Sequence, residues 1–280
     1  MSKGYIKALF ISLSFLVYAS NSTLASERAA NIANNINNFH PKNDIREKYR
    51  RMLCNDPDET EIAIKHANEA VTLLLKLYES SVDDYSLYFT QNENITIYSK
   101  KHGNVDIRKF HATIPSAFKY SNVIKKLWDF DNTQKLDDKF INGNVVRVYI
   151  QNLIIMEQST IAHTHSSPQK KYAIAAKVKV SNDTTVILCP SRTLNHLCLA
   201  DEKPNMKEIL ENTRSIEDDI DAEEALSKLG ANIAGFVVKR GGDNQVHVTY
   251  INAIYDDGHS PDSIHDKRNR CITYINILSL

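Results

Sequence analysis

The stretch that decides the fold is ANIAGFVVKRGGDNQVHVTYINAIYD, residues 231–256. Two apolar, β-branched runs flank a Gly-Gly-Asp centre at 241–243. This pattern is typical of a β-hairpin, because glycine tolerates the positive φ of tight turns. We therefore predict strands over residues 233–239 and 245–255. A hairpin alone is marginally stable in water, so the rest of the chain must extend it into a sheet.

The returning strand has no clean polar face. One side carries Val246, Val248, Tyr250, Asn252 and Ile254, and the other carries His247, Thr249, Ile251, Ala253 and Tyr255. Because both sides are partly apolar, we expect each of them to pack against other elements or to line a cavity.

The composition is that of an ordinary globular protein, with 42% hydrophobic and 24% charged residues in 280. Lys plus Arg and Asp plus Glu both number 34, so no basic excess indicates a nucleic-acid partner. The sequence contains no Gly-rich nucleotide loop, Gly-x-Ser-x-Gly, His-Glu-x-x-His or Cys-x-x-Cys motif. We therefore expect no cofactor and no enzyme activity.

The N-terminus has the features of a targeting segment. A basic start precedes an apolar run at 8–19, and Thr23 and Ala25 supply the small residues that signal peptidase selects. We predict a signal peptide over residues 1–25 and a polar, Asn-rich linker over residues 26–50. An uncleaved signal anchor is the alternative, although the run is shorter than the roughly 20 residues of a transmembrane helix.

The four cysteines match no zinc-binding spacing. Cys189 and Cys198 are close enough in sequence to close a loop, and Cys54 could then pair with Cys271. Four cysteines allow three complete pairings, and sequence does not choose among them. Four buried free thiols are the other interpretation, and they would suit a reducing final compartment.

Periodicity predicts the remaining elements. Apolar residues recur at helical spacing over 58–80, where Asp58 is the expected cap, and Ser116 is expected to cap a second helix running to about 129. Further strands are expected at 95–100, 105–114, 145–150, 153–161, 172–181 and 185–189. Residues 221–229 are expected to form a short surface segment.

The last predicted helix starts at Ser260-Pro261 and runs to the terminus. Its expected buried stripe consists of Ile264, Cys271, Ile272, Ile275 and Leu278. Short links between successive strands favour an antiparallel meander. The economical arrangement is an α+β fold in which a curved antiparallel sheet wraps the C-terminal helix.

Two groups of residues are candidates for function. Tyrosines fall on predicted strands, where they either pack at the sheet surface or line a mostly apolar pocket: Tyr98, Tyr149, Tyr172, Tyr250 and Tyr255. Arg147 lies in the middle of a strand, so it either faces outward or pairs with an anion in a cavity. His163 and His165 are better explained as a solvent-exposed loop pair than as metal ligands.

Several segments resemble a known family. The hairpin at 234–258 looks like the last hairpin of START lipid-transfer domains, whose final strand carries Val-Thr-Tyr/Trp and ends in Asp and Gly. Residues 92–103 and 105–115 resemble the first two strands of these domains, and 123–131 resemble their second helix. The combination is similar to the fam-a proteins of rodent malaria parasites, which pair a signal peptide with one START-like domain, here residues 51–280.

The resemblance implies a START-like helix-grip fold that binds or transfers a phospholipid, with phosphatidylcholine as the first candidate and no cofactor or chemical step. Tyr149 and Tyr172 fall where the family places aromatic residues around choline, whose charge is attracted to aromatic faces. Lys135 or Arg147 would meet the phosphate.

Two further lipid contacts complete the predicted set. Tyr250 lies on the closing hairpin, and Met156 stands where the family places a tryptophan of the choline cage. The resemblance also implies a monomer that is secreted, exported to the parasitophorous vacuole or host cell, and transiently in contact with a membrane surface. The alternative function is a surface interaction module of an infected cell without lipid transfer, and an enzyme is the least favoured class.

Overall fold

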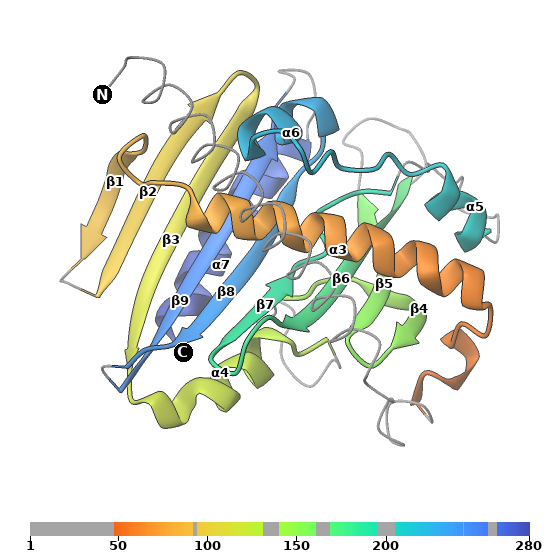
Figure 1. Cartoon of the computed structure of the whole chain (residues 1–280), viewed down its shortest axis with the longest axis horizontal. Helices are drawn as coiled ribbons and strands as arrows, with labels where there is room; N and C mark the ends of the chain where they lie inside the picture. The colour runs from red at the N-terminus through yellow and green to blue at the C-terminus, as the bar shows by residue number, and fades with distance from the viewer. Residues whose placement is uncertain are drawn as a thin grey trace, which may run out of the picture.

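The computed structural model describes residues 48–91, 94–130, 140–160, 169–194, 205–242, 244–256 and 262–280. For Ser159, Thr160, Gln169 and residues 262–265 the backbone alone is described. Nine strands form one antiparallel sheet in the order β1-β2-β3-β9-β8-β7-β6-β5-β4 (Figure 1). The strands are β1 Ser86–Gln91, β2 Ile95–His102, β3 Val105–Pro115, β4 Asn144–Ile150, β5 Leu153–Thr160, β6 Gln169–Lys179, β7 Thr184–Leu188, β8 Ile233–Arg240 and β9 Gln245–Tyr255.

Helices cover both faces of this curved sheet. They are α3 Pro57–Glu79, α4 Tyr120–Leu127, α5 Met206–Glu211, α6 Ala222–Leu229 and α7 Asp262–Leu278, with short 3-10 turns at η1 Arg50–Met52 and η2 Ala117–Lys119. In Figure 1, α3 crosses the front of the sheet, α7 lies behind it and α4 lies at its lower end. A curved antiparallel sheet with the C-terminal helix against one face confirms the predicted α+β helix-grip fold.

The hairpin β8–β9 is the centre of the sheet. Ile233 pairs with Ala253 and Arg240 with Val246, as the alternating apolar pattern predicts. We expected this hairpin to be the last pair of strands closing the sheet, but β9 also pairs with β3 along its whole length and β8 pairs with β7. The hairpin therefore joins the strands β1–β3 to the strands β4–β7 in one sheet. The positive φ at its turn belongs to Asn244, at 62°.

Helix α3 packs closely on one face of the sheet. Asp56, rather than the expected Asp58, caps the helix, because its Oδ1 accepts hydrogen bonds from the backbone N–H of Asp58 (2.9 Å) and Glu59 (3.3 Å). The close approach requires Gly235 on β8. A Cβ there would lie 2.5 Å from Leu74 Cδ2 and 2.6 Å from the carbonyl oxygen of Ile187.

The segment expected at the surface before the hairpin is instead part of this packing. Residues 222–229 form α6, whose Ala222, Ala225 and Leu226 are buried in the same core as α3. Asp221 caps its start and Gly230, with φ of 60°, ends it. The sequence did not predict this helix, because most of its residues are charged or polar and only one narrow stripe is apolar.

The predicted buried stripe of α7 is wrong at three of its five positions, while Ile272 is half-buried and the side chain of Ile264 lies outside the described part. Cys271 is exposed, as are Ile275 and Leu278, while Arg270, Tyr274 and Ile277 face the sheet. These three residues have helical spacing, so the helix is present but rotated about its axis relative to the expectation. The polar side chain of Arg270 can be buried because Asp106 of β3 and Asn252 of β9 form hydrogen bonds with it.

Two other local expectations also differ from the structure. Strand β1 was not predicted, and every one of its residues is exposed, because it pairs only with β2 at the sheet edge. Ser116 does not cap a helix with its side chain. It adopts φ of 82° and leads into the turn η2, and α4 begins only at Tyr120. The polar segment 131–139 lies outside the described residues.

Cys54, Cys189 and Cys271 are free thiols in this structure. Cys54 packs with the α3-side core, whereas Cys271 is exposed on α7 across the sheet, so the pairing of these two residues is excluded. Burial raises the pKa of the Cys189 thiol well above its usual range, which makes this residue an inert part of the core. Cys198 lies outside the described residues.

Candidate ligand-binding site

The side chains proposed from sequence do not converge on one site. Three of them lie on the face covered by α3: Arg147, Tyr149 and Tyr172. Two belong to the core on the α7 face: Met156 and Tyr250. Lys135 lies outside the described residues. Because the sheet separates the first group from the second, one cavity cannot be lined by both.

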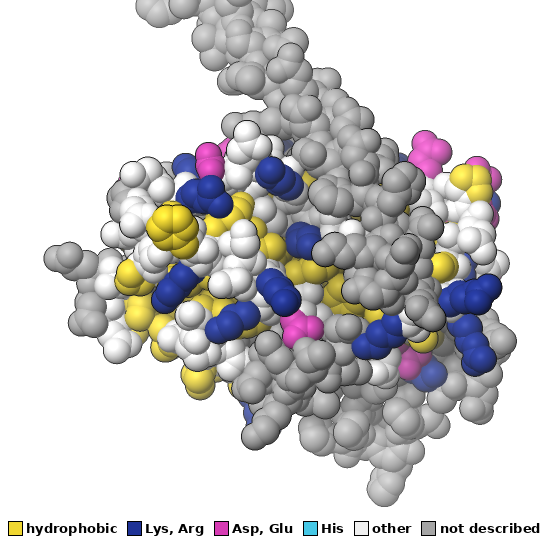
Figure 2. Space-filling view, turned by 90° about the horizontal axis from the view of Figure 1, so that it is seen from below, with side chains coloured by type: hydrophobic (Ala, Val, Ile, Leu, Met, Phe, Trp, Pro, Cys, Tyr) yellow, Lys and Arg dark blue, Asp and Glu magenta, His cyan; other side chains and the backbone are white. Residues whose placement is uncertain are grey.

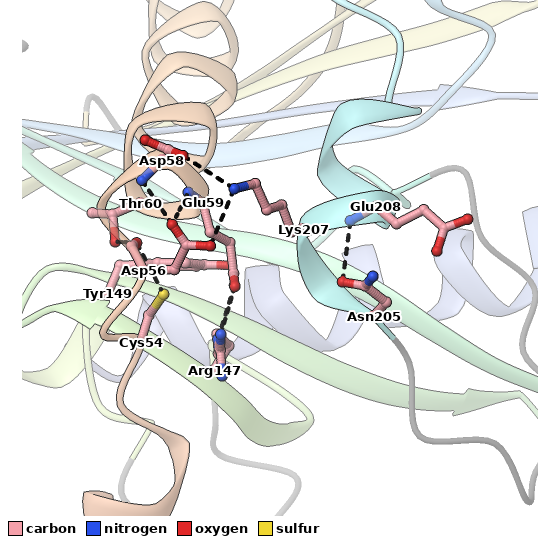
Figure 3. A network of polar contacts seen from close by, with 10 residues as sticks. All are labelled: Cys54, Asp56, Asp58, Glu59, Thr60, Arg147, Tyr149, Asn205, Lys207 and Glu208. Atoms are coloured by element: carbon pink, nitrogen blue, oxygen red, sulfur yellow. Dashed lines mark hydrogen bonds and ion pairs between the residues drawn. The ribbon is translucent and has the colours of Figure 1, made fainter.

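Arg147 and Tyr149 on β4 bind one carboxylate of α3 (Figure 3). Arg147 forms a fork with Glu59, with Nε to Oε1 at 2.8 Å and Nη2 to Oε2 at 2.5 Å. The hydroxyl of Tyr149 donates to the same Oε1 at 2.9 Å. Glu59 is only 3% exposed. A buried carboxylate needs such partners, because an unpaired charge in the interior is costly.

The protonation of this cluster follows from its geometry. The hydrogen bonds that Arg147 donates to Glu59 raise the pKa of its guanidinium above the usual range, so this group is always charged. Burial, together with the charge of Glu59, raises the pKa of Tyr149 far above its usual range. The phosphate role of Arg147 and the choline role of Tyr149 stay predictions, and the contacts with Glu59 give both residues a structural role. They clamp α3 to the sheet.

A second contact secures the same end of α3. Lys207 on α5 lies 3.2 Å from a carboxylate oxygen of Asp56 and 3.2 Å from one of Asp58, as Figure 3 shows. These charges are partly or largely exposed, so the pair adds modestly to stability. Its position nevertheless indicates that the polar network around the start of α3 joins helices to each other and not to a ligand.

Tyr172 on β6 is almost fully buried within the α3-side core. Its hydroxyl donates a long hydrogen bond of 3.4 Å to Glu157, and its carbonyl oxygen accepts from the backbone N–H of Leu194 at 2.8 Å. The ring is therefore surrounded by protein, and a role in stacking on a choline group is not supported by its position.

The middle of α3 carries a second buried ionic cluster. Glu69 accepts a hydrogen bond from the backbone N–H of Ile216 at 3.0 Å, and its Oε2 lies 3.4 Å from Nδ1 of His66 and 3.8 Å from Nη1 of Arg192. Arg192 is 1% exposed and also donates to the carbonyl oxygens of His66 and Arg214. Burial alone would raise the pKa of Glu69, but these partners together lower it. The cluster fastens the loop segments around 192 and 216 to α3.

The end of α3 is closed by Lys109 of β3. Its ammonium donates to the carbonyl oxygen and the hydroxyl of Ser80, both at 2.8 Å, and lies 4.3 Å from the centre of the Tyr85 ring. Burial lowers the pKa of Lys109 to about 8. A Ser–Lys pair could suggest a nucleophile, but Lys109 here satisfies the carbonyl groups at the end of a helix, which is an ordinary C-terminal cap.

The α7 face is different in chemistry. Aromatic rings contact one another across it, with Phe110 stacked on Tyr274 (centroids 5.0 Å apart) and Phe236 tilted against Tyr250 (4.8 Å). Phe140 meets Phe236 edge to face at 5.4 Å. Met156 lies in the same core. These residues form an apolar wall of the kind that receives hydrocarbon or aromatic ligand groups.

A buried arginine interrupts this wall. Arg270 of α7 is 2% exposed, and its Nε donates to Asn252 Oδ1 at 2.8 Å. Its Nη1 donates to Asp106 Oδ2 at 2.9 Å and its Nη2 to the Asp106 carbonyl oxygen at 3.3 Å. Asn252 in turn donates to the hydroxyl of Tyr250 at 3.0 Å. The helix is thus held to β3 and β9 by hydrogen bonds rather than by apolar contact alone.

One helical turn further along α7, two buried polar atoms have no hydrogen-bond partner. They are the hydroxyl of Tyr274 and Nε of Arg108, neither of which is satisfied by any described residue. Arg108 lies 3.6 Å from Asp106 and stacks over Tyr88 at 4.3 Å. Burial raises the pKa of Tyr274 to about 12, so its hydroxyl is a donor at neutral pH. Asn68, Tyr85 and Asn152 also carry an unpaired buried atom, but only Tyr274 and Arg108 hold theirs beside the aromatic wall, where a ligand could satisfy them.

A small pocket opens at the polar end of the same interface. It has a volume of ≈ 300 Å³ and is lined by Lys101, Asn104, Asp106, Asp256 and Lys267. Lys267 is 2.6 Å from Asp256, while Lys101 is exposed and forms no ion pair with any described residue. Asp106 is shared with the Arg270 network. The pocket is therefore adjacent to the buried Arg270 through Asp106, although Arg270 itself does not line it.

Pocket, arginine and aromatic wall follow one another along α7. Lys267 lies at the charged end of this row, and Arg270 is the buried polar residue in its middle. Tyr274 and Ile277 lie at the apolar end. We call this row, with the β3 and β9 side chains that face it, the graded interface. Sequence reasoning missed Arg270, Asp106 and Asn252, because their partners are far apart in the chain.

Metal and membrane-spanning elements are not found among the residues that the structure describes. No three His, Cys, Asp or Glu side chains there are grouped so that they could hold a metal ion, and His163 and His165 lie outside this part of the chain. No described helix is long and apolar enough to cross a bilayer.

No family model and no curated protein matches the chain. Several solved structures, by contrast, are similar to it. Human StAR-related lipid transfer protein 5 is 12% identical with a TM-score of 0.46, over 74% of this chain and 91% of that chain. Human STARD10 is 12% identical with a TM-score of 0.38, over 73% and 74%. A STAR-related lipid transfer protein from Xanthomonas axonopodis is 11% identical with a TM-score of 0.37, over 66% and 89%.

Proposed function

We propose that this protein binds a lipid at the graded interface, with the polar head group in the pocket at Lys267 and the hydrocarbon chain against the aromatic wall. The observation that carries the proposal is the unsatisfied hydroxyl of Tyr274 beside Phe110, one turn from the buried Arg270. An amphiphile satisfies both requirements at once, because it brings polar oxygen atoms and apolar carbon to adjacent positions.

The charges around the pocket favour a zwitterionic head group. Lys101, which forms no ion pair with any described residue, suits a phosphate, and Asp256 would meet a cationic group such as choline in exchange for its present partner Lys267. Phosphatidylcholine is therefore the first candidate ligand. The apolar wall, including Tyr250 and Met156, is the proposed contact surface for its acyl chains.

The wider setting of this function is also proposed. The signal peptide at 1–25 and the linker at 26–50 come from sequence patterns outside the described residues, and membership of the fam-a family and secretion with export to the vacuole or host cell come from the sequence resemblance. We propose a monomer without enzyme activity that contacts a membrane surface transiently to exchange its ligand. These proposals agree with the absence of catalytic motifs in the sequence.

Native mass spectrometry of the purified protein, together with transfer of labelled phosphatidylcholine between vesicles, tests the function. We expect a co-purifying phospholipid mass and measurable transfer. Lys101→Glu, which reverses an exposed charge at the pocket, should slow transfer at least tenfold, whereas Lys65→Glu on the far side of α3 should not. Neither bound lipid nor transfer in the wild-type protein would reject the proposal.

A second candidate function is a surface interaction module without lipid transfer. The observation in its favour is edge strand β1, where Leu87, Tyr88 and Phe89 are all exposed. An exposed apolar edge strand is a template for pairing with another chain. Capture of one defined partner by lipid-free protein, with the interaction lost in Leu87→Lys, would support this function over lipid transfer.

A further inference from the structure

One end of the molecule is built from four segments that are tied together. The backbone N–H of Ala117 donates to the carbonyl oxygen of Asn244 at 2.8 Å, joining η2 to the β8–β9 turn. The Tyr120 hydroxyl of α4 lies 2.9 Å from Thr185 of β7, and the Arg240 N–H donates to Asp183 O at 2.8 Å. We call this surface the basic end. It lies at the bottom of Figure 1 and faces the reader in Figure 2.

Phe118 protrudes from the basic end. Its exposed fraction is 90%, the highest among the exposed large hydrophobic side chains of the described residues. The turn that carries it is held on both sides, by the Ala117 hydrogen bond and by the buried Tyr120 ring. A phenyl ring fixed in water is unfavourable, so such a position indicates a surface that meets an apolar or interfacial partner.

Positive charge surrounds this ring. Lys119, Lys125, Lys126 and Lys239 are exposed and form no ion pair with any described residue. Arg240 stacks over the Tyr120 ring at 4.9 Å and lies 4.0 Å from Asp183. Figure 2 shows Lys and Arg side chains spread across this face, with hydrophobic side chains between them. Since the whole chain has a formal net charge of +0, the basic end is a local asymmetry.

We propose that the basic end docks on the surface of a bilayer that contains anionic phospholipids. Phe118 enters the interface between head groups and acyl chains, while the lysines of α4 meet the phosphates. A nucleic acid or an acidic protein would use the charges but would leave Phe118 without a role. The assignment goes beyond the proposed function, because the basic end lies at the Gln245 end of β9 and the proposed head-group pocket at its Asp256 end.

The test is sedimentation of the full mature chain with vesicles of phosphatidylcholine alone or of phosphatidylcholine with phosphatidylserine. We expect binding to the anionic vesicles only. Replacing Lys119, Lys125 and Lys126 together by Gln should weaken it about a hundredfold, since each lysine near such a surface contributes about a factor of five to ten. Phe118→Ser should weaken it about tenfold.

Matched controls use residues away from the basic end. Leu87→Ser removes an exposed apolar side chain from β1, and Lys65→Gln removes an exposed charge from α3, so both should bind like the wild type. Thermal melts verify that each variant is folded. Equal binding to both vesicle types, or unchanged binding of the Phe118 and lysine variants, overturns the proposal, as does retention on heparin without any vesicle binding.

The outcome is separable from that of lipid carriage. Vesicle binding is measured without a transfer step, so a protein that docks but carries no lipid retains this inference and loses the proposed function. A protein that carries lipid but does not distinguish the vesicle types has the opposite outcome.

Discussion

The two faces of the sheet bury side chains in different ways. On the α3 face, apolar residues and alanines pack under a long helix, and each of the buried charges Glu59 and Glu69 has several partners. On the α7 face, the described part of the helix buries Arg270, Tyr274 and Ile277, and leaves the hydroxyl of Tyr274 unsatisfied. Unpaired buried atoms also occur on the α3 side, at Tyr85 and Asn68, so the faces differ in their buried charges and in the aromatic wall of the α7 face, which is the proposed binding surface.

The largest effect should come from the closest packing on the α3 face. Gly235→Val would drive a side chain into Leu74 and the backbone of Ile187, so we expect a loss of roughly 4 kcal/mol or more in the free energy of unfolding, measured with urea. Gly242→Ala is the matched control, because nothing lies within 4 Å of a Cβ there. A Gly235→Val protein as stable as the wild type would mean that α3 does not approach β8 so closely.

Breaking the clamp between α3 and β4 should have the next largest effect. Arg147→Met leaves Glu59 buried without its charged partner and should cost about 3 kcal/mol. The double variant Glu59→Met with Arg147→Met should recover much of that loss, since no charge then remains buried. Lost lipid binding with unchanged stability in the single variant would return Arg147 to the ligand site.

Lowering the pH should reduce the stability of the folded protein through His111, which lies on the α3 face. Nδ1 of His111 is hydrogen-bonded to the hydroxyl of Thr249 at 2.8 Å. Burial, with a smaller contribution from Lys109, lowers the pKa of His111 from 6.5 to about 4. Between these values the unfolded chain binds a proton that the folded protein does not, so stability falls as pH falls. We expect a loss of about 1–2 kcal/mol from pH 6.5 to 4.5. His111→Asn should remove that part of the slope, and an unchanged slope would assign it to other groups.

The smallest expected effect on stability comes from removing one tyrosine hydroxyl, a change that can be made on both faces. Tyr149→Phe removes a donor to Glu59 and should destabilise the lipid-free protein by about 1 kcal/mol. Tyr274→Phe removes a buried hydroxyl without a partner and should leave stability unchanged or raise it by up to about 1 kcal/mol. The second variant should also bind lipid more weakly. Equal destabilisation by both substitutions would remove the distinction between the faces.

The sequence predicts the strands well and the site poorly, for physical reasons. Apolar β-branched runs and short turns are local signals, so the two strands of the β8–β9 hairpin and most neighbouring strands follow from them. The rotation of α7 does not. Arg270 faces inward because Asp106, 164 residues away, and Asn252 form hydrogen bonds with it. Apolar Ile275 is left outside, so a rule that places apolar residues inside selects the wrong face.

The same limit applies to the predicted ligand residues. The ligand roles of Arg147 and Tyr149 follow from the family resemblance, and their strand positions leave a surface or structural role equally open. The structure instead pairs them with Glu59, 88 and 90 residues earlier in the chain. By contrast, Tyr250 and Met156 both lie on the α7 face, and nothing local in β9 or β5 tells which side of the sheet each residue faces.

Hydrogen–deuterium exchange of the lipid-free and phosphatidylcholine-loaded protein tests most directly whether the α7 face is the binding surface. We expect peptides of α3 to exchange slowly in both states. Peptides of α7 and of the facing strands β3 and β9 should exchange faster without lipid and become protected when lipid is bound. Protection confined to α3 or β1, with α7 unchanged by lipid, would contradict a ligand site at the graded interface.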